Sequence, residues 1–119
     1  MDEAKTRLET LIGKVKAKLP DGGKIYLATI SYIAENAAYN NTGKKQEELD
    51  AIVDTYNDEV KAIADADDMI TLADINSQLT LSDLKDGIHS NDGGYYKMGA
   101  YWYSLIKDEI INRINEMSE

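Results

Sequence analysis

Apolar residues recur at three- and four-residue spacing in three stretches of the chain, which is the pattern of amphipathic helices. The first stretch predicts a helix over residues 2–19, ended by Pro20 and the glycines that follow it. The second predicts a helix over residues 46–64. The third predicts a final helix that Asn91 or Asp92 can cap. The buried stripe expected on this last helix consists of Met98, Trp102, Leu105, Ile106, Ile110 and Ile114.

Two short apolar runs without clean alternation separate these helices and predict strands over residues 24–30 and 69–75. Such runs are typical of strands that are buried on both faces, as in parallel sheets. Strand, helix and strand in this order make one right-handed crossover, so we expect an α/β fold with a parallel sheet. Loops are expected over residues 31–45, with a helical turn near residues 34–38, and over residues 76–94.

The number of predicted strands is small for this fold class. Two parallel strands are too few for a sheet with two covered faces, and no strand precedes the first helix. The pattern looks like the second half of a doubly wound sheet whose first strands are missing, so residues 1–119 are expected to form the carboxyl-terminal portion of one domain. Because an unpaired strand edge favours association, we expect a complementary amino-terminal half or a second copy as partner.

Composition and charge narrow the classes of function. The 119 residues suffice for one ordinary domain. The net charge of −9, from 13 basic and 22 acidic residues, disfavours binding to nucleic acid or anionic membranes, which needs clustered positive charge. No apolar run approaches the roughly 20 residues of a membrane span. The chain has no cysteine and one histidine, which excludes thiolate chemistry and sites with two imidazoles, and we expect neither a metal nor a cofactor.

The single histidine, His89, follows Asp86 by three residues, between a predicted strand and a predicted helix. In a turn, this spacing lets the carboxylate accept a hydrogen bond from one ring nitrogen and leaves the other nitrogen free as a general base. Aspartate is common in this chain, so the spacing alone favours a surface histidine beside a solvated acid.

The wider stretch over residues 86–98 changes that balance. It reads Asp-Gly-Ile-His-Ser-Asn-Asp-Gly-Gly-Tyr-Tyr-Lys-Met, which resembles the last conserved block of the SGNH hydrolases, also called GDSL esterases and lipases. Residues 4–19 and 24–30 are similar to a helix and a strand of that family, and residues 56–57 and 72–74 resemble later blocks. The similarity is greatest with acetyl-xylan esterases and related polysaccharide deacetylases of bacteria.

This resemblance implies a flavodoxin-like three-layer α/β/α fold and a Ser-His-Asp ester hydrolase that needs no cofactor. His89 would be the general base and Asp86 the acid that orients it. The family's Gly-Asp-Ser nucleophile block and its two oxyanion blocks are absent from the chain. We therefore expect the chain alone to be inactive and to supply the His-Asp part of an enzyme that deacetylates plant cell-wall polysaccharide or cleaves another short acyl ester. An extracellular or cell-surface location in a bacterium is also implied.

Other features carry weaker signals. Tyr32 and Tyr39 lie in the loop after a parallel strand, where open α/β sheets bind ligands, and with Asn91 they are candidate substrate contacts. The acidic run at residues 65–68 lacks the glycine and glutamate of a calcium-binding loop, which favours a solvated turn. The absence of a nucleophile block leaves open a second class of function, a non-catalytic interaction or assembly module that kept the fold.

Overall fold

Three helices and two strands alternate along the chain in the computed structural model, which describes residues 2–37 and 42–118. The order is helix, strand, helix, strand, helix, as the apolar spacing predicts. Two short 3₁₀ helices, Ile75–Gln78 and Leu81–Asp83, precede the last helix. The main elements are α1 (Asp2–Lys16), β1 (Ile25–Ala28), α2 (Gln46–Asp65), β2 (Ile70–Ala73) and α3 (Asp92–Ser118).

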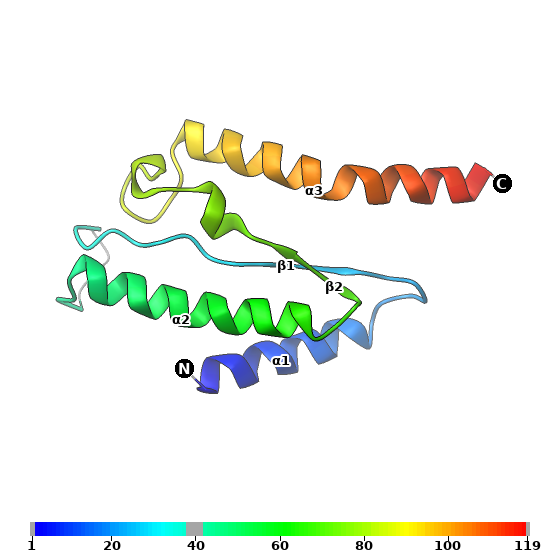
Figure 1. Ribbon diagram of the computed structural model, residues 1–119, viewed down its shortest axis with the longest axis horizontal. Coiled ribbons are helices and arrows are strands. Elements are labelled where there is room, and N and C mark those ends of the chain that lie inside the picture. Colours follow the sequence, from blue (N-terminus) through cyan, green and yellow to red (C-terminus); the bar gives the residue numbers. More distant parts are fainter. Residues whose placement is uncertain (1, 38–41, 119) are drawn as a thin grey trace.

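The two strands form a parallel sheet between two layers of helices (Figure 1). Ile25 pairs with Ile70 at one end of the sheet, and Ala28 pairs with Ala73 at the other. Helices α1 and α2 lie on one side of the sheet and α3 lies on the other. The expected α/β fold with a parallel sheet is confirmed.

A buried hydrophobic cluster lies between the sheet and the layer of α1 and α2. Because side chains alternate along a strand, Tyr26 of β1 faces the other way, toward α3. There its ring meets the Trp102 ring edge-on, with 6.3 Å between the ring centroids. The centre of the buried cluster and the partly buried residues around it are Ile12, Ala64 and Ile70, with Leu8, Ile25, Leu27, Ile63 and Leu72.

Both strands are shorter than predicted, and past the last backbone hydrogen bond between them, from the Thr29 N–H to the Ala73 C=O at 3.0 Å, side chains bind the backbone groups. Beyond β1, the Ile30 N–H and C=O bind the side-chain amide of Asn57 from α2, both at 2.9 Å. Beyond β2, the Asp74 N–H donates to the Tyr101 hydroxyl of α3 at 2.8 Å. The prediction that the first strand is buried on both faces is wrong. All of β1 is half-buried, because within the described residues it has a strand on one edge only.

Two helix boundaries also differ from the prediction. α1 ends at Lys16 rather than residue 19, because the chain tightens into turns in which the Lys18 N–H donates to the Val15 C=O at 3.0 Å. α3 begins at Asp92, so Gly94 belongs to its first turn and not to the preceding loop. The expected cap is present, since the Asn91 side-chain oxygen accepts the Gly94 N–H at 2.9 Å.

The apolar stripe predicted for the last helix is not buried. Trp102 is half-buried, whereas Ile110 and Ile114 are 49% and 55% exposed. Helical spacing determines which residues share a face, but the carboxyl-terminal half of α3 extends past the sheet (Figure 1). Near that end, the Arg113 guanidinium donates to the Gly22 C=O at 2.6 Å.

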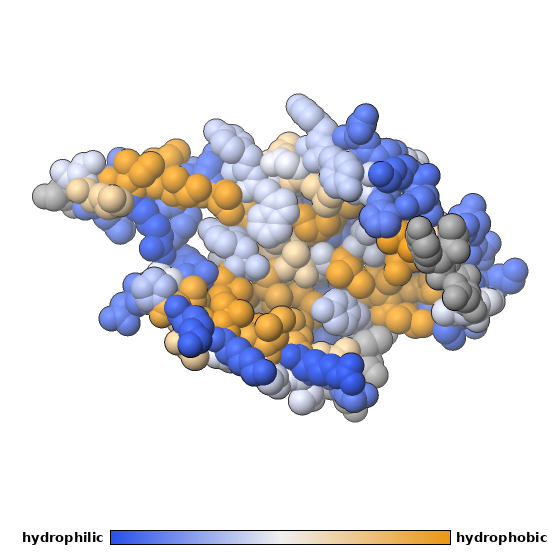
Figure 2. Space-filling view, turned by 180° about the vertical axis from the view of Figure 1, so that it is seen from behind, coloured by the Kyte–Doolittle hydropathy of each residue, from blue (hydrophilic) through white to orange (hydrophobic). Residues whose placement is uncertain are grey.

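The molecule exposes more surface than its size requires. Its accessible area is 8057 Å², roughly 1,600 Å² above the ~6,450 Å² of a compact 13.3 kDa monomer. The radius of gyration is 16.7 Å, compared with about 13.5 Å for a compact chain of this length. Hydrophobic side chains gather along the projecting end of α3 and across the middle of the face in Figure 2. Part of the apolar surface therefore has no covering layer within the described residues.

Candidate active site

Residues 84–90, here called the dyad loop, carry Asp86 and His89. An antiparallel bridge between Leu84 and Ser90 closes the base of the loop, and the Lys85 N–H donates to the His89 C=O at 2.8 Å. The loop lies beyond the carboxyl ends of the strands, near the loop that follows β1 (Figure 1). Open parallel sheets bind ligands at this edge.

The Asp86 carboxylate holds His89 through both of its oxygens. Oδ2 lies 2.6 Å from the ring Nδ1, and Oδ1 accepts the backbone N–H groups of His89 at 2.6 Å and of Ile88 at 2.9 Å. These hydrogen bonds, the one from the His89 N–H foremost, lower the pKa of Asp86. Because an ionised carboxylate only accepts hydrogen bonds, the contact assigns the ring proton to Nδ1 and leaves Nε2 as the basic nitrogen. The His89 side chain is 56% exposed.

Gly87 packs the tip of the dyad loop against the loop after β1. Its φ is +86°, and a Cβ atom at this position would lie 2.8 Å from the Ala37 Cβ and 3.0 Å from the Ala34 Cβ. The Gly87 C=O accepts the Ala34 N–H at 2.9 Å. Residues 34–37 form a turn where the sequence predicts one, closed by the Ala37 N–H and the Ala34 C=O at 3.0 Å. Glycine is therefore required between Asp86 and His89 by both conformation and space.

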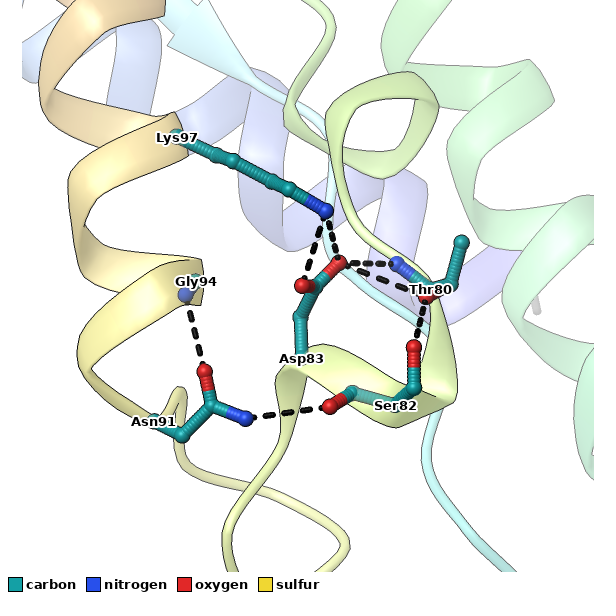
Figure 3. Close-up of polar contacts among 6 residues, drawn as sticks. All are labelled: Thr80, Ser82, Asp83, Asn91, Gly94 and Lys97. Carbon is teal, nitrogen blue, oxygen red and sulfur yellow. Dashed lines mark hydrogen bonds and ion pairs between the residues drawn. The ribbon is translucent and has the colours of Figure 1, made fainter.

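Asp83, just before the dyad loop, is a buried carboxylate in an ion pair with α3 (Figure 3). Its two oxygens accept hydrogen bonds from the Lys97 ammonium at 2.8 and 3.0 Å, and one of them also accepts the Thr80 N–H at 2.9 Å. Lys97 first, and then the Thr80 N–H, lower the pKa of Asp83. Sequence reasoning missed this pair, although the Thr-x-x-Asp spacing of residues 80–83 is typical of a capping box.

Asn91 closes the other end of the dyad loop. Besides capping α3 through its side-chain oxygen, it donates from Nδ2 to the Ser82 C=O at 3.0 Å (Figure 3). Both ends of its amide thus bind the chain itself. Its role as a substrate contact stays a prediction.

The other candidate substrate contacts lie on the loop after β1. The Tyr32 hydroxyl donates to Asp54 of α2 at 2.6 Å, and this hydrogen bond raises the pKa of Tyr32. Tyr39 lies outside the described residues. A groove of about 760 Å³ lies between the loop after β1 and the segment before α3. Asp86 and Gly87 line this groove, and His89 does not. Substrate binding by the tyrosines stays a prediction.

No serine hydroxyl is hydrogen-bonded to the His89 ring within residues 2–37 and 42–118. Ser90, the next residue in the chain, is 5% exposed and lies against Gly94 in the first turn of α3. The described residues therefore contain a histidine whose ring is held by a carboxylate, but no serine hydroxyl that is hydrogen-bonded to that ring.

The acidic run after α2 serves as a turn. Asp67 accepts the Met69 N–H at 3.0 Å and forms an ion pair with Lys16 of α1, which lowers the pKa of Asp67. In the part of the chain that the structure describes, no three His, Asp or Glu side chains come together as a metal site. None of the described helices is both long enough and apolar enough to cross a lipid bilayer.

Comparison with known proteins relates the chain to an esterase. It is 32% identical over 110 residues to a multidomain esterase from Ruminococcus flavefaciens, and the match covers 90% of this chain and 13% of that protein. The chain is thus a distant homologue of a region of a bacterial esterase, and it spans about an eighth of that protein's length. No protein-family model matches the chain, and no solved structure shows significant similarity to it.

Proposed function

We propose that this chain supplies the histidine–aspartate part of a serine ester hydrolase of the SGNH type. The observation that carries the proposal is the 2.6 Å contact between Asp86 Oδ2 and His89 Nδ1, next to an exposed ring. A carboxylate in this position orients the imidazole for base catalysis. Homology to a region of an esterase supports the same reaction class.

In the proposed reaction, a serine hydroxyl attacks the ester carbonyl while His89 Nε2 takes the hydroxyl proton. Asp86 keeps the other ring proton on Nδ1 and stabilises the imidazolium that forms. Nε2 then protonates the leaving alcohol, and an acyl-serine remains. In the second half of the reaction, Nε2 takes a proton from water as the water attacks the acyl-serine, and returns it to the serine oxygen.

The serine is proposed to come from a complementary segment that carries the Gly-Asp-Ser block. β1 has a strand on only one edge within the described residues, and the chain exposes roughly 1,600 Å² more surface than a compact monomer. A parallel strand added beside β1 would bring its carboxyl end to the edge that holds the dyad loop. Residues after that strand would therefore lie near His89. Self-association through the same edge is the alternative.

The substrate is proposed to be an acetyl ester on a plant cell-wall polysaccharide, with other short acyl esters as the broader class. This proposal rests on the resemblance of residues 86–98 to the acetyl-xylan esterase branch of the SGNH hydrolases. Tyr32, on the loop after β1, and Asn91 are the candidates for contact with the sugar among the described residues. An extracellular or cell-surface location in a bacterium is proposed on the same basis.

A non-catalytic interaction or assembly module is the second candidate function. One observation favours it: no serine hydroxyl is bonded to the His89 ring in residues 2–37 and 42–118. A non-catalytic module has no need for a carboxylate that positions a histidine through three hydrogen bonds. The intact contact between Asp86 and His89 therefore favours the hydrolase.

A chimaera separates these two functions. The chain would replace the matched region of the Ruminococcus flavefaciens esterase, and turnover of p-nitrophenyl acetate and acetylated xylan would be compared with a version that lacks the region. We expect activity above that background, lost in the His89→Ala variant and kept in a control variant outside the dyad loop and the groove, Lys107→Ala. The isolated chain is expected to be inactive on both substrates. A folded chimaera whose esterase activity is the same with and without His89→Ala would favour the non-catalytic module.

A further inference from the structure

The two ends of the dyad loop are joined at its base by backbone contacts. The Asn91 N–H at the end of the loop donates to the Asp83 C=O at its start, at 2.7 Å. The same Asp83 holds Lys97 of α3 through both carboxylate oxygens. Asp83 therefore joins the two ends of the loop through its backbone, and its ion pair with Lys97, drawn in Figure 3, joins them to the helix that follows.

The base of the dyad loop lies close to α3, and there one carboxylate, of Asp83, faces one ammonium group, of Lys97. A Cβ atom on Gly94 would lie 2.6 Å from the Asp83 C=O, so glycine is needed for the first turn of α3 to sit on the loop base. The Asp83 side chain is 9% exposed and its partner Lys97 is 50% exposed. Without the ammonium, Asp83 would be a nearly buried carboxylate whose charge is unpaired, which favours opening of the loop base to water.

We propose that Asp83 and Lys97 are positioning residues for the dyad: their ion pair clamps the base of the dyad loop to α3 and so holds Asp86 against His89. Neither side chain touches Asp86, the His89 ring or a reacting atom, and the effect passes through the backbone of residues 84–90. The catalytic meaning of this clamp rests on the proposed hydrolase function. The clamp itself is a property of the chain alone.

Amide hydrogen exchange on the isolated chain tests the clamp. The Lys97→Met variant keeps the length of the side chain and removes its charge, and Lys97→Arg restores a two-pronged donor. Lys107→Met on the same helix is the matched control, because Lys107 lies over the Tyr103 ring and away from the loop. The reporters are the amides of Lys85 and His89 in the loop, and of Val60 in α2.

We expect Lys97→Met to speed exchange of the two loop amides about ten- to a hundredfold, with the Val60 amide unchanged, which is the signature of local opening. Lys97→Arg should return most of the protection, and Lys107→Met should leave all three amides unchanged. Unaltered loop amides would overturn the proposal. Equal acceleration at Val60 would also overturn it, because the pair would then stabilise the whole fold.

The chimaera gives the catalytic readout separately. There, Lys97→Met should lower kcat and leave KM nearly unchanged, and Lys97→Arg should recover kcat, because only the alignment of the base is affected. A shift in KM alone would contradict positioning of the dyad. A chimaera without esterase activity would refute the proposed function, while the exchange rates would still decide whether the clamp exists.

Discussion

Replacing Gly87 with alanine perturbs the point where the dyad loop meets the loop after β1. The residue has a φ of +86°, and left-handed backbone costs a side-chain-bearing residue about 1–2 kcal/mol. The added methyl would also lie 2.8 Å from the Ala37 Cβ, and overpacking of this kind costs about 1–3 kcal/mol. Alanine also lowers the conformational entropy of the unfolded chain, which offsets ~0.4–1 kcal/mol, so the net loss in free energy of unfolding is about 1–4.5 kcal/mol.

Alanine substitutions at two other glycines separate the backbone cost from the packing cost. Gly22 has a φ of +78° with no atom within 4 Å of its Cβ position, so Gly22→Ala carries only the backbone cost, about 1 kcal/mol net. Gly99 lies inside α3 with equally open space, so Gly99→Ala should stabilise the chain by about 0.5–1 kcal/mol. In urea unfolding followed by circular dichroism, Gly87→Ala should lower the midpoint by about 0.5–2 M with the slope unchanged.

The comparison with Gly22→Ala decides the result. If Gly87→Ala loses no more stability than Gly22→Ala, residue 87 does not pack against Ala34 and Ala37 in solution. The tip of the dyad loop would then be free, and the described placement of Asp86 and His89 beside the loop after β1 would be wrong.

Three further perturbations have defined outcomes. Lys16 lowers the pKa of Asp67, so the charge of Asp67 stabilises the fold fully above the ordinary aspartate pKa of about 4, and this stabilisation is lost as pH falls through the lower pKa of the folded state. The gap between the urea midpoints of wild type and Asp67→Asn should therefore shrink as pH falls below about 4, and a constant gap would contradict this. Asn57→Ala removes the amide that ends β1 and should cost about 1–3 kcal/mol in urea unfolding, whereas a neutral result would mean that water replaces the amide. The double variant Ile110→Glu and Ile114→Glu should leave the free energy of unfolding nearly unchanged in urea unfolding, because the two residues are 49% and 55% exposed, and a loss above about 1 kcal/mol would mean that this face of α3 is covered in solution.

The order of elements could be predicted from apolar spacing, but their ends and their burial could not. The spacing places α2 to within one residue of its observed bounds. The end of β1 depends on Asn57, which lies nearly thirty residues further along and supplies an amide in place of a strand. The exposure of Ile110 and Ile114 depends on what covers α3, and periodicity carries no information about a neighbouring layer.

In the candidate site too, the local contact could be predicted from the sequence and the tertiary contact could not. The contact between Asp86 and His89 follows from residues three apart in one turn, so the local sequence carries its signal. The burial of Asp83 depends on Lys97, fourteen residues later, and on the missing Cβ of Gly94. A tertiary contact of this kind has no local pattern beyond the capping-box spacing of residues 80–83.

The protonation of the His89 ring tests the central claim most directly, because the chain can act as proposed only if Asp86 orients that ring. Nitrogen-15 NMR of the neutral ring reports which nitrogen carries the proton. The account predicts a proton on Nδ1 and a bare Nε2 in the wild type, with this preference lost in Asp86→Ala. A wild-type ring that carries its proton on Nε2, or a proton position that is the same in wild type and Asp86→Ala, would contradict the account.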